Sequence, residues 1–255
     1  MGRTLAGKKS RGKGKKKDDN CEDGAIVVLE VSPDGEIVRE THRPDDHARD
    51  WISDIKFNPR GNTVAVGGHD RKVHLYKFSR KDGRLTRVAK CGSSTSAVTH
   101  IDFDESGDFI QTNDQSYELL WYNTANGKQV TSATATRDVE WDTWTCTLGW
   151  PVQGIWPPFA DGSDINATDR SQDKMYIASA DDDGAVKLFH YPCITEGAGF
   201  QLGTGHSSHV TNVRFMPDAE EDPKRRGGRD AAVEPAYQLV TTGGNDRSII
   251  VWAIQ

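Results

Sequence analysis

Histidine and aspartate groups that could bind a metal occur at two places in this sequence. His206 and His209 form a His-x-x-His pair, and residues 181–183 form a run of three aspartates. A metal site needs ligands that converge on one point, as two histidines do on one face of a helix. At the start of a strand, a spacing of three residues puts His206 and His209 on opposite faces. The aspartate run coincides with a turn that recurs along the chain, so we predict no metal ligand.

Signatures of other chemistries are absent as well. The cysteines are far apart and lack the spacing of a zinc site or a secreted disulfide scaffold, which predicts reduced thiols. They are Cys21, Cys91, Cys146 and Cys193. The chain has no Gly-x-Ser-x-Gly elbow, no P-loop and no dinucleotide fingerprint. We therefore predict a protein that is not an enzyme, with no catalytic residue and no cofactor.

The N-terminus is a basic arm on an acidic body. Residues 1–17 hold eight basic residues and no acidic one, whereas the whole chain has a net charge of -6. A segment of this composition cannot bury apolar surface, so residues 1–24 are predicted to be disordered. The arm is either a solubilising terminus or a tether for a polyanion. The cations proposed for such contact are Lys8, Lys9, Arg11, Lys13, Lys15, Lys16 and Lys17.

Two classes of partner are disfavoured by the composition. The arm carries no aromatic side chain that could stack on bases, which argues against specific nucleic-acid binding. No apolar run approaches the roughly 20 residues that a membrane helix needs, and no secretory signal follows the lysines. We expect a cytoplasmic protein without a membrane partner.

A repeat organises the rest of the chain. Four segments, which begin near Trp51, Val98, Asp164 and His209, each read as short strands with period-two alternation separated by Gly, Asp and Asn turns. The distance from Phe57 to Phe103 is about 46 residues, close to the roughly 40–45 residues of a WD40 blade. The sequence thus predicts an all-β, WD40-type β-propeller with about four full blades plus a partial one.

The predicted segments follow the repeat. They are a partial blade at 25–45, blades at 50–91 and 96–135, a linker insert at 136–163, and blades at 164–204 and 205–255, the last with a mobile loop at 218–235. An arc of this size exposes interior faces and edge strands. We therefore expect one of three outcomes: another protein chain completes the ring, a larger assembly covers it, or the sequence is a fragment of a longer product.

Recurring polar residues mark the blades. Asp70, Asp183 and Asp246 each stand five residues before an apolar residue of a closing strand, where a carboxylate can accept N–H groups of a tight turn. In the second repeat this place holds Gln115, next to Asp114. His206 opens the last repeat, and Trp252 stands in its closing strand. We predict structural roles for Asp70, Asp183, Asp246, His206 and Trp252.

The insert carries several aromatic residues with two possible roles. They either cover the joint between two blades or form an exposed interaction surface. They are Trp141, Trp144, Trp150, Trp156 and Phe159.

The run from Trp141 to Cys193 is distinctive beyond the general repeat. With its flanking strands, it resembles the C-terminal propeller of the echinoderm microtubule-associated protein-like (EMAP-like) family over about residues 25–255. The family's coiled coil, HELP motif and first propeller have no counterpart here. The resemblance implies a non-catalytic binding platform for microtubules or tubulin, located in the cytoplasm on the cytoskeleton, the ciliary axoneme included. The alternative is a scaffold subunit of a ciliary or cytoskeletal complex without direct tubulin contact.

Overall fold

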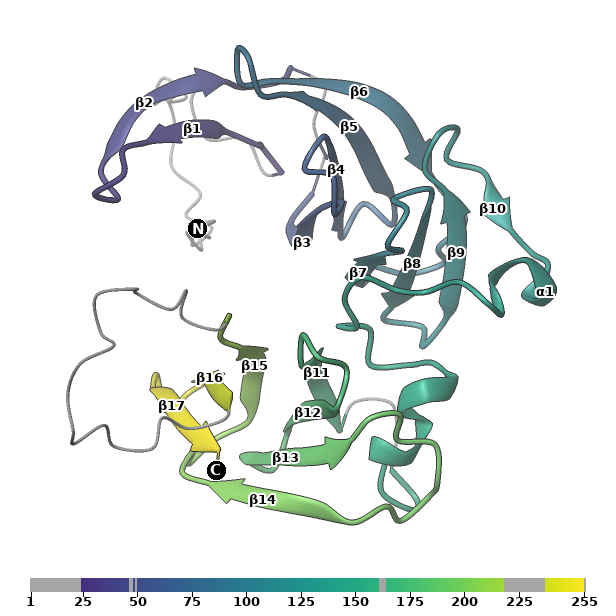
Figure 1. Cartoon of the computed structure of the whole chain (residues 1–255), viewed down its shortest axis with the longest axis vertical. Helices are drawn as coiled ribbons and strands as arrows, with labels where there is room; N and C mark the ends of the chain where they lie inside the picture. The colour runs from purple at the N-terminus through teal and green to yellow at the C-terminus, as the bar shows by residue number, and fades with distance from the viewer. Residues whose placement is uncertain (1–23, 46–47, 49, 161–163, 218–236, 255) are drawn as a thin grey trace, which may run out of the picture.

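A computed structural model describes residues 24–45, 48, 50–160, 164–217 and 237–254. Almost all of its regular structure is antiparallel β-sheet, arranged as an arc of small sheets around a common centre (Figure 1). The predicted arm at 1–24 and loop at 218–235 lie outside the described residues, except for Gly24.

Three of the sheets have four strands each. The first comprises β3 (Ile52–Phe57), β4 (Thr63–Gly68), β5 (Val73–Ser79) and β6 (Arg84–Cys91). The second comprises β7 (Val98–Phe103), β8 (Phe109–Asp114), β9 (Leu119–Asn123) and β10 (Gln129–Val130). The third comprises β11 (Ile165–Arg170), β12 (Tyr176–Asp181), β13 (Ala185–His190) and β14 (Phe200–Thr204).

Two smaller sheets form the ends of the arc. One is the hairpin of β1 (Val28–Val31) and β2 (Ile37–His42). The other comprises β15 (Val210–Phe215), β16 (Tyr237–Gly243) and β17 (Ile249–Ile254). The ring is not closed between these two sheets (Figure 1), so the expectation of an all-β propeller with an incomplete ring is confirmed.

The first strand of each larger sheet lies innermost. Strands β3, β7, β11 and β15 surround the centre, and β3 contacts β7 while β11 contacts β15. Each of the four inner strands has a register shift near its second residue, for example between Ile52 and Asp54. A bulge of this kind bends the strand and turns side chains towards a neighbouring blade.

The apolar core is divided among the joints between sheets. One cluster joins the first two four-stranded sheets and includes Leu75 and Ile101, and another joins the last two blades through Leu188 and Val213. A third packs Ile26, beside β1, onto Tyr76 of β5. Each blade therefore completes its core only against its neighbours, which is why the unit repeats.

The insert fills the joint between the second and third four-stranded sheets. It contains a short helix, α1 (Ala133–Thr136), and a 3₁₀ helix, η1 (Trp150–Ile155). Trp141 and Trp144 are buried there and pack edge to face, so they take the first of the two roles considered above. Trp156 is half-buried, whereas Trp150 and Phe159 are exposed.

Candidate functional site

Six charged or titratable side chains gather where the inner strands meet. We name them the channel cluster: Asp54, Lys56, His100, Asp102, Asp169 and Arg214. Four of them, Lys56, Asp102, Asp169 and Arg214, occupy the fifth position of β3, β7, β11 and β15. Two cations and two anions therefore stand at one level of the four strands. Opposite charges brought together in this way stabilise each other's ionised form.

Asp102 holds the insert against strand β7. It is fully buried and accepts the backbone N–H groups of Thr145 and Cys146 at 2.8 to 2.9 Å and the hydroxyl of Thr143 at 2.6 Å. Burial alone would raise the pKa of Asp102, but the charge of Lys56 and these hydrogen bonds outweigh it and lower the pKa to about 2. Asp102 is therefore ionised and crosslinks segments about 40 residues apart.

Asp54 and Asp169 connect neighbouring blades in a related way. Asp54 accepts the backbone N–H of Ile101 at 2.9 Å, and Asp169 accepts that of Phe215 at 2.7 Å. Burial raises the pKa of both carboxyl groups, that of Asp169 to about 6, against the opposing charge of Arg214. Burial also lowers the pKa of His100 to about 4, helped by the charges of Arg214 and Lys56. The largest cause of all three pKa shifts is burial.

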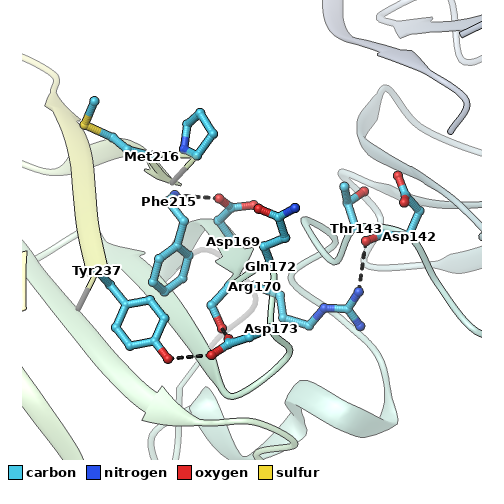
Figure 2. Close-up of a pocket in the computed structure, with 11 residues that line it drawn as sticks. Asp142, Thr143, Asp169, Arg170, Gln172, Asp173, Phe215, Met216 and Tyr237 are labelled. Atoms are coloured by element: carbon cyan, nitrogen blue, oxygen red, sulfur yellow. Dashed lines mark hydrogen bonds between the residues drawn. The ribbon is translucent and has the colours of Figure 1, made fainter. Parts of the chain in front are cut away.

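A hollow of about 480 Å³ opens beside the channel cluster (Figure 2). Arg170 lines this hollow and donates to the carbonyl oxygens of Trp141 at 2.7 Å and Asp142 at 3.0 Å. The Arg170 guanidinium also lies over the ring of Tyr191. On the opposite wall, the hydroxyl of Tyr237 donates to Asp173. These polar groups are thus engaged in joining the insert and the last blade to the third sheet.

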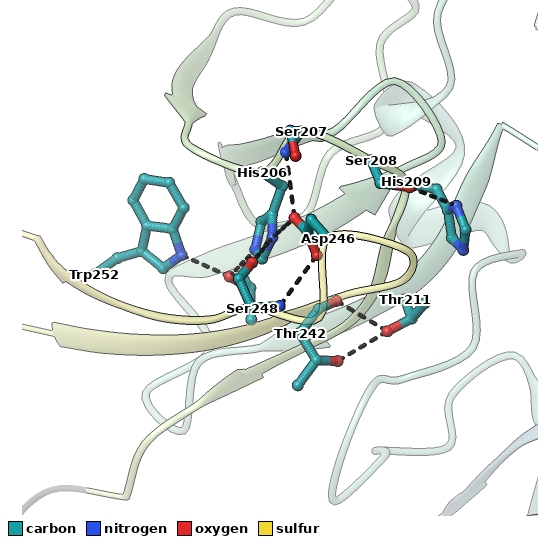
Figure 3. A network of polar contacts seen from close by, with 10 residues as sticks. His206, Ser207, Ser208, His209, Thr211, Thr242, Asp246, Ser248 and Trp252 are labelled. Atoms are coloured by element: carbon teal, nitrogen blue, oxygen red, sulfur yellow. Dashed lines mark hydrogen bonds and ion pairs between the residues drawn. The ribbon is translucent and has the colours of Figure 1, made fainter.

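The last blade contains a buried polar network (Figure 3). The indole N–H of Trp252 donates to Thr241 Oγ1 at 2.8 Å, and His206 Nε2 lies 2.8 Å from the same hydroxyl. His206 Nδ1 lies 2.9 Å from Oδ2 of Asp246. This oxygen also accepts the backbone N–H of Ser207, and Oδ1 of Asp246 accepts that of Ser248. The network links the loop before β15 to the two strands that follow it.

In two other blades, the corresponding aspartate has fewer hydrogen-bond partners, all within its own turn and the strand that follows. Asp70 lies 2.7 Å from His74 Nε2 and accepts the N–H of Lys72 at 3.2 Å. Asp114, next to the predicted position Gln115, accepts the N–H groups of Ser116 and Glu118.

The structure places Asp183, His206 and His209 differently from what the sequence suggested. Asp183 is exposed and accepts one N–H, from Ala185 at 3.1 Å. The buried carboxylate of that turn is Asp181, which pairs with Lys187 and accepts the hydroxyl of Ser179. The expectation that His206 and His209 begin a strand is wrong, because β15 begins at Val210 and both precede it.

The channel cluster was not among the residues singled out from the sequence. A sequence signal for the cluster was nevertheless present, because a charged residue recurs at the fifth position of the four inner strands. The arm cations at positions 8–17 lie outside the described residues. Within the described part of the chain, no group of three or more His, Cys, Asp and Glu side chains is placed to hold a metal ion. No helix among those residues is both long enough and apolar enough to cross a bilayer.

Two features define a WD40-type β-propeller. The four-stranded antiparallel sheets place their first strands around a centre, and the last blade contains a His–Asp–Thr–Trp network. Residues 19–254 match the profile of the family described as "Echinoderm microtubule-associated protein second beta-propeller". The chain belongs to this family of echinoderm microtubule-associated protein propellers, as its resemblance in sequence implied.

Three relatives illustrate the similarity. Echinoderm microtubule-associated protein-like 2 of Rattus norvegicus is 42% identical over 203 residues, which are 80% of this chain and 29% of that protein. Echinoderm microtubule-associated protein-like 1 of the same species is 39% identical over 203 residues, again 80% of this chain and 23% of that protein. The 77 kDa echinoderm microtubule-associated protein of Strongylocentrotus purpuratus is 36% identical over 231 residues, 91% of this chain and 30% of that protein. The chain thus spans less than a third of the length of these relatives.

Proposed function

We propose that the chain is a non-catalytic propeller that associates with microtubules or tubulin. The observation that carries the proposal is membership of a propeller family whose relatives are named microtubule-associated proteins. The proposal places the protein in the cytoplasm on the cytoskeleton. A ciliary location remains a prediction from the sequence.

The polar groups at the centre of the propeller form hydrogen bonds within the fold, which supports a binding role over a catalytic one. A catalytic site needs a nucleophile or base that is free to meet a substrate. The carboxylates of the channel cluster accept backbone N–H groups, and burial raises the pKa of the nearby Cys146 thiol well above its ordinary value. A thiol in this state is a poor nucleophile at neutral pH.

The basic arm is proposed to strengthen the association. Tubulin surfaces are acidic, so the cations among residues 8–17 would attract them, and the attraction would weaken as salt rises. The test is a microtubule co-pelleting assay at low and moderate salt. It compares the full chain with a chain lacking residues 1–17 and with one whose arm cations are replaced by glutamine.

Weaker pelleting of both altered chains, most marked at low salt, is the expected result. Unchanged pelleting would remove the arm from the proposal. If the unaltered chain stays in the supernatant in both salts, the direct association itself is wrong. A scaffold role within a cytoskeletal complex would then be the better reading.

A further inference from the structure

Residues 71–90 are a second basic segment, inside the folded body. They contain eight basic residues and one acidic residue, Asp82, for a net charge of +7. Because the whole chain has a net charge of -6 and residues 1–17 contribute +8, all remaining residues together carry -21. The rest of the body is therefore strongly acidic on balance.

The fold puts this segment on the periphery of the arc. It forms most of the hairpin of β5 and β6, and β6 is the outermost strand of its sheet (Figure 1). Lys77, Lys81, Arg84 and Lys90 are all exposed, and we call them the basic rim. Arg84 and Lys90 lie six residues apart on β6, which corresponds to about 20 Å of extended chain.

The cations of the basic rim form no close ion pair with a carboxylate in the described part of the chain. None of the four forms an ion pair within 4 Å with a carboxylate that the structure describes. Two other exposed cations of the body are paired, Arg39 with Glu30 at 2.7 Å and Arg137 with Asp138 at 2.9 Å. The rim therefore presents a net positive charge to solvent, with the carboxylate of Asp82 near Arg84.

Protection of a sheet edge does not account for this charge. Cations on an edge strand do prevent unwanted pairing with other chains. However, three other outermost strands, β10, β14 and β17, contain no charged residue, and β14 exposes the apolar side chain of Leu202. The rim also continues into the turn at Lys81, where no strand edge needs protection.

We propose that the basic rim is a docking surface for an acidic polypeptide segment in extended conformation. The rim extends for about 20 Å along the edge of the hairpin, the length of a run of roughly six acidic residues, and it presents Arg84 and Lys90 on opposite faces of β6 because of a bulge between them. A short flexible segment reaches the rim without approaching the acidic body, which would repel a large polyanion. The rim has no exposed aromatic side chain on which bases could stack, since Tyr76 is buried and Phe78 packs against Phe57. The surface therefore fits a polypeptide better than RNA.

The inference deepens the proposed function, because an acidic tail of a cytoskeletal partner is the kind of segment that the rim would hold. Its test needs no microtubule, so the two proposals fail separately. Fluorescence anisotropy measures binding of a labelled peptide of about ten glutamates to the full-length chain at low salt. The test variant is Lys81→Glu with Arg84→Glu. The control with the same charge change is Arg137→Glu with Arg247→Glu, on exposed residues of the insert and of the last blade.

We expect the test variant to bind the peptide about tenfold more weakly, since two exposed attractions become repulsions. The control should change by less than about twofold. Equal losses in both variants would overturn the proposal, because binding would then follow net charge alone. Tighter binding of an RNA oligonucleotide of matched charge, lost in the same test variant, would also overturn it.

A second measurement separates the rim from the N-terminal arm. Carbodiimide treatment joins carboxylates to lysines that they contact, and mass spectrometry identifies the joined residues. Crosslinks of the glutamate peptide to Lys77, Lys81 or Lys90 are expected. Crosslinks confined to residues 8–17 would place the binding on the arm and refute the rim. Thermal unfolding of each variant verifies that the propeller stays folded.

Discussion

Two groups of the channel cluster, His100 and Asp169, shift the pH dependence of stability in opposite directions. His100 has a folded pKa of about 4, below its ordinary value of 6.5. As pH falls from 6.5 to 4, the unfolded chain binds a proton that folded His100 does not, so stability falls. Asp169 has a folded pKa of about 6, above its ordinary value of 3.8. Over nearly the same range, folded Asp169 binds a proton that the unfolded chain does not, so stability rises.

Single substitutions should therefore separate the two effects. Each shift corresponds to about 3 kcal/mol between pH 6.5 and 4. Relative to the unaltered chain, His100→Asn should gain stability as pH falls through this range, and Asp169→Asn should lose it. Urea unfolding at several pH values measures both differences. If both variants follow the unaltered chain in parallel, the assigned shifts are wrong.

The network of the last blade depends on one hydroxyl. Thr241 is fully buried and bonds to both Trp252 and His206. Thr241→Val keeps the shape of the side chain but leaves two buried polar groups without this partner. We expect a loss of about 1–3 kcal/mol in the free energy of unfolding. The matched control is Thr211→Val on the neighbouring strand, whose exposed hydroxyl bonds to Thr242. Equal effects of the two variants would contradict the role of the network.

At the scale of elements, the insert is a structural part of the ring. Its segment around Thr145 lies between β7 and β11, where it bonds to Asp102 on one side and accepts the Thr168 hydroxyl on the other. The side chains of Trp141 and Trp144 then fill the joint between the two sheets. The insert thus replaces direct contact between two inner strands.

Asp102→Asn tests this role. The substitution removes the negative charge that attracts the Thr145 and Cys146 N–H groups, and it leaves Lys56 without the anion. We expect the free energy of unfolding to fall by about 3 kcal/mol and the two amides to exchange hydrogen faster. Hydrogen-exchange mass spectrometry of the 143–148 segment measures the second effect. Asp108→Asn, at an exposed turn residue, is the control. Unaltered protection of the segment in the Asp102 variant would argue against the crosslink.

At the scale of the molecule, the two ends of the arc expose apolar strands. Ile249 and Val251 on β17 are 71% and 61% exposed, and β17 pairs on one side only with a described strand. On the other end, Ile37 of β2 is 65% exposed. A free apolar edge favours pairing with another chain.

We therefore expect the chain to associate beyond its 28.2 kDa monomer as concentration rises. Ile249→Lys with Val251→Lys should shift the sedimentation profile towards the monomer, because charge at an edge opposes pairing. The control is Val88→Lys with Met175→Lys, at exposed apolar residues away from the two ends. A monomer at all concentrations would refute the expected association, and equal shifts in both variants would refute the role of the edge.

The blades themselves were within reach of the sequence. Period-two alternation and tight turns act over a few residues, so β4 and β5 around Asp70 follow from local pattern. The resemblance of the Trp141–Cys193 run to one propeller family likewise rests on residues close in the chain, and the family assignment is confirmed.

Other features required the tertiary structure. Which aspartate of residues 181–183 is buried depends on how β12 meets Lys187, and the three adjacent carboxylates are alike in sequence. The pairing of Asp102 with Thr145 joins residues 43 positions apart, beyond any local pattern. The run of cations at 71–90 was visible in the sequence, but ion pairs and exposure decide whether such charge is compensated. Contacts between residues far apart in the chain set both, and they exist only once the strands and blades have packed together.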